Sequence, residues 1–239
     1  MAGEREGTLT RYGTRRGLPQ TAPQSYSWRV TEHEQVTQLF SAERFKAFVD
    51  AVVAIAMTLL ILPLMESVSE AASDKLSTAE FLNEHGGQLT SFVLSFVLIA
   101  NSWIGHHRQY NQVDVITRPL LWINVVWMAT IVWLPVPTAM LGQMDSDPLQ
   151  AVLYIGTLML TQVANLAARL YLLRHPTFTG HDPQRIRMGA MADIASILLF
   201  GVALVIVIMI GSIGYFALFL LALTGILART LKRVFVRRG

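Results

Sequence analysis

Long apolar runs separated by short polar segments dominate the chain from residue 45 onward. A helix needs roughly 17 to 25 mostly apolar residues to cross a bilayer. Five runs have this length, and the last, residues 194–228, contains no charged residue. That run is too long for one span, and Gly211, Ser212 and Gly214 within it favour a turn. The pattern therefore predicts six transmembrane helices.

The predicted spans cover about residues 44–65, 88–108, 118–142, 149–171, 190–211 and 212–230, and together form one transmembrane domain over 42–233. Residues 1–41 are polar and contain no apolar stretch of the kind that a signal peptide has, so we expect a flexible cytoplasmic arm. Residues 234–239 are expected to form a short basic cytoplasmic tail.

The positions of the charged residues support the number six. With six spans, all but one of the 19 Lys and Arg residues lie on the same side as both chain ends, and the exception is Lys75. An excess of Lys and Arg marks the cytoplasmic side, and five spans would place the basic C-terminus outside. The sequence thus predicts an all-α integral membrane protein with six transmembrane helices and both termini in the cytoplasm, as a multi-pass protein of the cell (plasma) membrane.

Composition agrees with this class. Only 15% of the residues are charged, against about 25% in soluble domains. The absence of cysteine excludes disulfides and thiolate metal sites. No metal-ligand cluster, nucleophile–base set or glycine-rich phosphate loop is apparent, so we expect no enzyme activity, no cofactor, no metal site and no nucleic-acid partner.

Ionisable residues in the spans gather at two places. Arg44 and Asp50 lie at the cytoplasmic start of the first span, and His106 and His107 lie at the cytoplasmic end of the second. Trp103 and His107 share a helix face, so Asp50 is expected to accept hydrogen bonds from both. A solvated Asp50 stabilised by the helix dipole is the alternative. His106 is expected to face the lipid headgroups.

The first span also carries an apolar stripe. At about 100° per residue, Ile55, Leu59 and Leu62 fall within about 60° of one another, and Thr58 lies at the border of this stripe. Asp50 lies nearly opposite. The spacing alone also fits a face that contacts lipid or another helix.

Three motifs identify a family. The run from Arg44 to Ala51, R-F-K-A-F-V-D-A, resembles the R-x-x-x-F-S-D-[AG] signature of the transmembrane protein 175 family, the lysosomal potassium channels. The second span has an S-F…W-x-x-H-H arrangement from Ser95 to His107, and the third has L-W-x-N and L-P-x-P-T between Leu121 and Thr138. The resemblance covers spans one to three by motif and spans four to six by topology.

The resemblance implies a homotetrameric, potassium-permeable cation channel in the membrane lipid, with potassium as its permeant ion and no other cofactor. It implies that the first helix lines the pore and that a hydrophobic constriction at Ile55, Leu59 and Leu62 replaces a conventional selectivity filter. Thr58 falls on a position tied to selectivity.

The resemblance also implies a structural polar network of Arg44, Asp50, Trp103 and His107 that holds the first helix in place. Here Val49 stands where the signature has serine. Valine has no side-chain donor or acceptor, so we expect a smaller or rewired network.

Two other functions compete with the channel. One is a secondary transporter or proton-conducting pathway that uses Asp50 and His107 as carriers, although no convincing repeat relates the two halves of the chain. The other is a membrane enzyme, for which the sequence contains no catalytic set.

Overall fold

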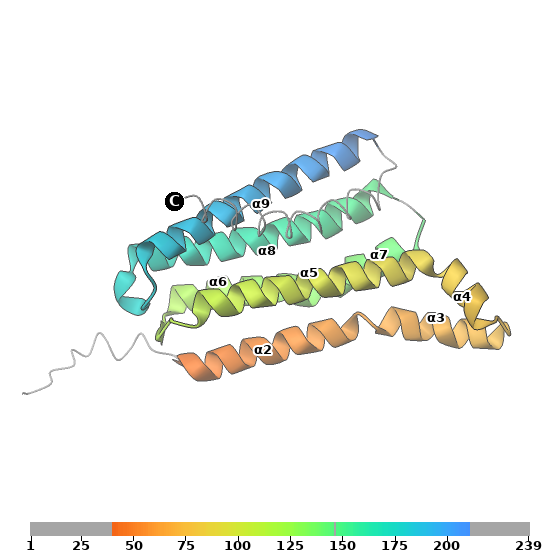
Figure 1. The fold of residues 1–239 in the computed structure, drawn as a ribbon, viewed down its shortest axis with the longest axis horizontal. Coiled ribbons are helices and arrows are strands. Elements are labelled where there is room, and N and C mark those ends of the chain that lie inside the picture. Colours follow the sequence, from red (N-terminus) through yellow and green to blue (C-terminus); the bar gives the residue numbers. More distant parts are fainter. Residues whose placement is uncertain (1–39, 146, 211–239) are drawn as a thin grey trace, which may run out of the picture.

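The protein is described by a computed structural model that covers residues 40–145 and 147–210 (Figure 1). Its elements in chain order are β1 (Phe40–Ser41), α2 (Ala42–Leu59), α3 (Leu62–Ser73), α4 (Thr78–Glu84), α5 (Gly86–Tyr110), β2 (Val115–Ile116), α6 (Arg118–Trp133), α7 (Pro135–Gln143), α8 (Pro148–Arg174), the 3₁₀ turn η1 (Pro176–Phe178) and α9 (Pro183–Ile210). The predicted span 212–230, most of the predicted arm and the basic tail lie outside the described residues.

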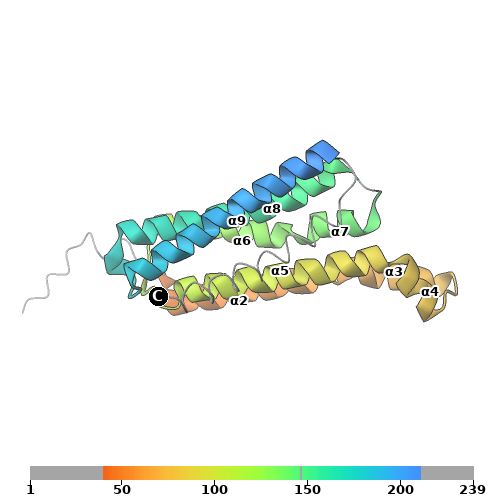
Figure 2. The same cartoon turned by 45° about the horizontal axis from the view of Figure 1, so that its top comes forward.

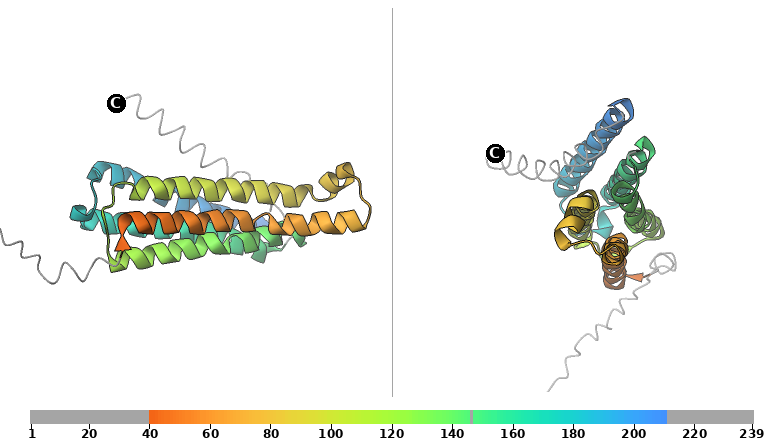
Figure 3. Two further views of the ribbon diagram at one scale, coloured as in Figure 1. Left: turned by 90° about the horizontal axis from the view of Figure 1, so that it is seen from below. Right: turned by 90° about the vertical axis from the view of Figure 1, so that its right-hand side faces the viewer.

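Five helical segments of the described chain are long and apolar enough to cross a membrane. They are Ala42–Ser73, Gly86–Tyr110, Arg118–Gln143, Pro148–Arg174 and Pro183–Met209. Their ranges overlap the first five predicted spans, and the fifth begins several residues earlier than predicted. They run along the long axis of an elongated bundle (Figure 3).

Two spans that the hydropathy pattern predicts as single helices are each divided by proline. α2 ends at Leu59 and α3 starts at Leu62, with Pro63 in its first turn. Proline has no backbone N–H, so Pro63 cannot donate to the carbonyl of Leu59. Pro135 likewise begins α7 directly after the end of α6. Hydropathy alone did not predict these breaks because it does not register a missing backbone donor.

The helices pack in a defined order. α2 packs on α5 and α6, α7 packs on α5 and α8, and α8 packs on α6 and α9. Figure 2 shows α8 and α9 on one side of the bundle and α2 and α5 on the other, with α6 and α7 between them. One flank of α2 is therefore left uncovered by the described chain.

The core lies where α2, α5, α6 and α8 meet. Val49 and Val53 of α2 are buried against a shared cluster that includes Tyr110, Trp127 and Tyr154. Val49 is 1% exposed, so it is a packing residue. This burial gives a physical use for an apolar side chain at the signature serine position.

Three segments are tied together at one end of the bundle, which we call the basic end (residues 40–46, 106–118 and 169–187). β1 pairs antiparallel with β2, with Ser41 opposite Val115. A further bridge joins Val113 to Thr179, and the Gly180 N–H donates to the Gln112 carbonyl at 2.8 Å. The predicted arm thus ends in a short strand at its last two residues.

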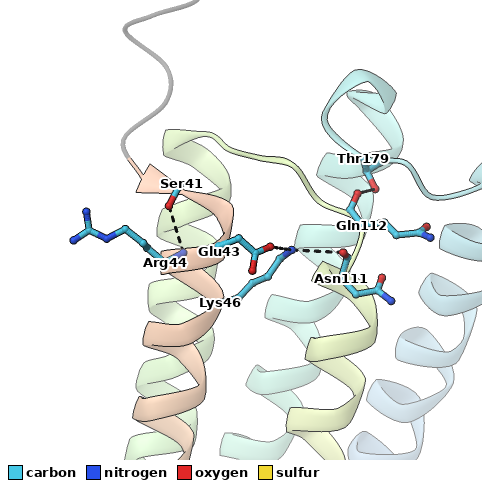
Figure 4. Close-up of polar contacts among 7 residues, drawn as sticks. All are labelled: Ser41, Glu43, Arg44, Lys46, Asn111, Gln112 and Thr179. Carbon is cyan, nitrogen blue, oxygen red and sulfur yellow. Dashed lines mark hydrogen bonds and ion pairs between the residues drawn. The ribbon is translucent and has the colours of Figure 1, made fainter.

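Side chains reinforce this end of the bundle (Figure 4). The Ser41 hydroxyl caps α2 by accepting from the Arg44 N–H at 3.4 Å. Lys46 lies 3.3 Å from the Glu43 carboxylate and donates to the Asn111 carbonyl at 3.5 Å, which links α2 to the end of α5. Thr179 donates to the Gln112 carbonyl at 3.2 Å.

His181 makes this end of the bundle sensitive to acid. Its Nε2–H donates to the Gln109 carbonyl at 3.1 Å, and its Nδ1 is buried without a partner in the described chain. Burial lowers the pKa of His181. The folded state therefore binds the proton less readily than the unfolded state, and stability falls as the pH drops below about 6.5, the unperturbed value.

We expect His181→Asn to reduce this loss of stability. The measurement is the unfolding midpoint in detergent at a series of pH values from about 7 down to about 5. His175→Asn, at an exposed position beyond α8, is the control. If both variants keep the wild-type pH dependence, His181 is not the group responsible.

Candidate pore-lining helix and its polar anchors

The stripe predicted on the first span lies on the uncovered flank of α2 and α3. Ile55 is 59% exposed, Leu59 is 37% exposed and Leu62 is 52% exposed in the single chain. Val53, Ala56 and Leu60 lie on the other flank and are buried. α2 thus has two apolar faces, one filled by its own chain and one left open.

The break before Pro63 changes the geometry of this stripe. Ile55 and Leu59 belong to α2, whereas Leu62 is the first residue of α3. The angle deduced for a continuous helix therefore does not apply to Leu62. Leu62 is nevertheless exposed in the single chain, as Ile55 and Leu59 are.

Thr58 is exposed at the end of α2, beside this stripe. Its hydroxyl donates to the Ile55 carbonyl at 2.7 Å. Because a hydroxyl has one hydrogen and two lone pairs, the Thr58 oxygen remains able to accept from water or to coordinate a cation.

A short hydrogen bond joins α2 to α5. The Trp103 indole Nε1–H donates to the Asp50 carboxylate at 2.7 Å. Both side chains are half-buried, which strengthens a charge-assisted bond. The structure thus brings together two of the four residues of the expected network.

The other two residues of that network lie apart from Asp50 in the described chain. His107 is exposed and packs its ring against Trp103, with centroids 6.0 Å apart, and no hydrogen bond joins it to Asp50 in the described residues. Arg44 is exposed, and its side chain points away from the bundle (Figure 4). Arg44 contributes a backbone N–H to the Ser41 cap.

The prediction that His106 faces the lipid headgroups is wrong. His106 is 4% exposed, and its ring stacks between Tyr110 and Trp127 with centroids 4.4 and 4.2 Å away. Its Nε2 lies 2.7 Å from the Asn124 Oδ1. The Asn124 amide donates to the Tyr110 hydroxyl at 2.6 Å and to the Leu120 carbonyl at 2.7 Å, so Oδ1 is the acceptor and His106 Nε2 carries the hydrogen.

The spacing of residues in the sequence indicates which face of α5 points into the bundle. Ser91, Ser95, Ile99 and His106 recur at helical spacing along α5, and all four are buried. His106 and His107 lie at the same depth, but neighbouring residues on a helix point in different directions. Depth alone therefore does not predict which of the two faces inward.

Three hydroxyl groups form a chain through the core. Tyr154 lies 2.9 Å from the Ser95 hydroxyl, and Thr138 lies 2.8 Å from the same Ser95 oxygen and 2.8 Å from the Leu134 carbonyl. One direction satisfies every hydrogen: Tyr154 donates to Ser95, Ser95 to Thr138, and Thr138 to Leu134. The chain joins α5, α7 and α8 next to the break at Pro135.

A buried ion pair joins the last two described helices. The Arg169 Nε lies 2.7 Å from the Asp193 Oδ2, and both side chains are largely buried. This pair was not predicted from the sequence. Their opposite charges near the same end of adjacent antiparallel helices were the available signal.

The described residues contain no group of three or more His, Asp and Glu side chains placed to hold a metal ion. Several polar groups in the spans instead pair between helices, such as Trp103 with Asp50 and His106 with Asn124. Such pairing is what a bilayer requires, because the lipid provides no hydrogen-bond partner.

Comparison with known proteins connects this arrangement to a family. The profile of the family described as the endosomal/lysosomal potassium channel TMEM175 matches residues 44–135, from α2 to the start of α7. A potassium channel from Streptomyces collinus is 30% identical over 174 residues, which cover 72% of this chain and 78% of that protein.

More distant proteins show similarity over different lengths. The endosomal/lysosomal proton channel TMEM175 of Danio rerio is 25% identical over 167 residues, but these span only 31% of its length and 68% of this chain. The crystal structure of a lysosomal potassium-selective channel TMEM175 homolog from Chamaesiphon minutus has a TM-score of 0.55 with 21% identity, covering 78% of this chain and 97% of that chain.

Fold and matches together define a multi-pass helical membrane protein whose relatives are named as ion channels, not as enzymes. Within that class, the chain belongs to the TMEM175 family. The resemblance carried by the three sequence motifs is thereby confirmed.

The bond between Trp103 and Asp50 leads to a stability prediction. Trp103→Phe removes the donor and should lower the free energy of unfolding by about 1.5–3 kcal/mol, the value of a hydrogen bond to a charged group. Asp50→Asn keeps an acceptor and should cost less. The double variant should lose less than the sum of the two, because both substitutions remove the same interaction.

Chemical unfolding in detergent micelles measures these losses. Trp122→Phe is the matched control, since Trp122 is 67% exposed on α6, and we expect almost no change. The bond between Trp103 and Asp50 would be shown to contribute nothing to stability by either of two results. One is an equal loss of unfolding free energy in Trp103→Phe and Trp122→Phe, and the other is a double variant whose loss equals the sum of the two single losses.

Proposed function

We propose that this chain is the subunit of a potassium-permeable cation channel whose pore is lined by α2. The observation that carries the proposal is the open apolar face at Ile55, Leu59 and Leu62, next to a hydroxyl at Thr58. Family membership and the potassium channel from Streptomyces collinus support it.

A pore lined by α2 requires several copies of the chain. One helix cannot enclose an ion path, and closed rotational symmetry brings the same face of each subunit to a common axis. We propose a homotetramer, in which the exposed flank of α2 faces the axis.

The constriction acts through water. A ring of Ile and Leu side chains disfavours a continuous water column, so an ion passes only after losing part of its hydration shell. Potassium holds its water less tightly than sodium does, which favours potassium at an apolar ring. The free lone pairs of Thr58 supply oxygen ligands at the same level.

We also propose the orientation and the remaining span. The basic end is cytoplasmic, since Lys and Arg mark that side. The apolar residues 212–230 form a sixth span, which returns the C-terminus to the cytoplasm. The protein resides in the cell membrane.

Proton permeation is a second candidate function. The relatives from Danio rerio and Gallus gallus are named proton channels. A carrier role for Asp50 and His107 as a pair has little support, because Asp50 accepts from Trp103 and His107 lies on the exposed surface. Protons would therefore cross by the same path as potassium.

Ile55→Asn should raise potassium flux by roughly tenfold, the change produced by lowering a barrier by about 1.4 kcal/mol. A polar side chain at the ring holds water and reduces the dewetting barrier. Flux into liposomes is measured with potassium, sodium or caesium as the only cation, and a pH-sensitive dye reports proton entry.

Val93→Asn is the control, because Val93 is 55% exposed and belongs to α5 rather than to α2. Unchanged flux in Ile55→Asn, or an equal increase in Val93→Asn, would exclude the constriction. Saturable flux coupled to a second solute would exclude the channel itself.

Native mass spectrometry tests the assembly separately. We expect a particle of four 26.6 kDa chains. Substituting Leu59 by Glu should weaken this particle, since four carboxylates would then approach one axis. A monomer in mild detergent and in lipid nanodiscs would contradict the tetramer.

A further inference from the structure

A cavity of about 460 Å³ lies at the basic end, between α5, α8 and α9. Its volume is within the range of small-ligand sites, about 300–1,000 Å³. Its polar lining includes Arg108, Gln109, Arg169, His181 and Arg185. No residue of α2 lines it, so this cavity is separate from the proposed pore face.

The charge of this cavity is strongly one-sided. Three guanidinium groups line it, and none of the described residues in its lining carries a carboxylate. Arg169 uses its Nε to bind Asp193 from the side, which fixes the guanidinium in place. The remaining N–H groups of Arg169, with those of Arg108 and Arg185, are donors suited to an oxyanion.

Gly189 keeps the cavity in this form. It lies on the wall of α9, and a Cβ at this position would overlap the guanidinium of Arg169. Any other residue would displace Arg169 from its place against α9. Ala192 continues the same wall one turn later.

Two acceptors in the lining have no partner in the described chain. Gln109 is 4% exposed, its Oε1 is unpaired, and its amide donates only a long bond of 3.4 Å to the Asn165 carbonyl. His181 Nδ1 is also unpaired, since Nε2 donates to the Gln109 carbonyl. Buried polar groups without partners are costly, and these two acceptors belong to side chains that line the cavity.

We propose that this cavity binds a phosphate ester that carries hydroxyl groups. The three arginines match the phosphate oxygens, and the Gln109 and His181 acceptors match the hydroxyl hydrogens. Such a group is presented by the headgroup of an anionic glycerophospholipid and by a soluble glycerol phosphate. Guanidinium binds phosphate through paired N–H groups, which a single ammonium cannot do.

The test uses the full-length protein in neutral detergent and two probes. The first is glycerol phosphate, compared with chloride at equal ionic strength and read as a shift of the unfolding midpoint. The second is phosphatidylglycerol, compared with phosphatidylcholine and read as retained lipid by native mass spectrometry.

Arg108→Gln and Arg185→Gln together remove two donors at exposed positions that do not carry the fold. We expect them to weaken binding of the successful probe by at least roughly tenfold, because the phosphate loses charge-assisted hydrogen bonds from two guanidinium groups. Arg187→Gln is the control for Arg185→Gln: it lies on the same helix, α9, and removes one positive charge, but it does not line the cavity.

Gln109→Leu tests the hydroxyl acceptor. It should reduce binding of glycerol phosphate while leaving binding of inorganic phosphate nearly unchanged. Binding of both probes, or of glycerol phosphate alone, identifies a site open to soluble phosphate esters, and binding of phosphatidylglycerol alone identifies a lipid headgroup site. Binding of neither probe, or an equal loss in Arg187→Gln, overturns the proposal.

Discussion

The bilayer interior provides no hydrogen-bond partner, so a polar side chain within a helical span is stabilised when it pairs with a group on another helix. Trp103 meets Asp50 between α5 and α2, and His106 meets Asn124 between α5 and α6. Ser95 links α7 and α8 through hydroxyl groups, and the Arg169–Asp193 pair links α8 to α9. Each of these interactions depends on direction as well as distance. Together they therefore constrain which helices are neighbours and how each helix is rotated about its axis, which apolar contacts constrain less strictly.

The same constraint explains why α2 has two unlike apolar faces. Val49, Val53 and Ala56 are packed inside the subunit, and Asp50 is held by α5. The opposite flank presents Ile55 and Leu59, which are 59% and 37% exposed in the single chain. A helix that is packed on one side and exposed on the other is suited to face the symmetry axis of an oligomer. Pro63 follows α2 and ends its continuous helical segment near Leu59.

The basic end has a different physical character. Its segments are held together by backbone pairing between β1 and β2 and between Val113 and Thr179. These segments lie near water, which competes for the same hydrogen-bonding groups. Charge accumulates there because arginines at the ends of α5, α8 and α9 converge on one cavity. Helix α5 contributes to both features: its Trp103 binds Asp50 of α2, and its Arg108 and Gln109 line the cavity.

The sequence by itself determined the spans, the concentration of positive charge at one end, the family and the stripe on the first helix, because hydropathy, charge and motif spacing are local properties of the chain. It also indicated that Trp103 and Asp50 meet, since both lie at the same depth on adjacent helices. Only the tertiary structure decided that His106 points inward to Asn124, that Arg44 and His107 stay apart from Asp50, and that Arg169 pairs with Asp193. Those outcomes depend on the rotation of each helix about its axis, which is set by packing between residues distant in the chain.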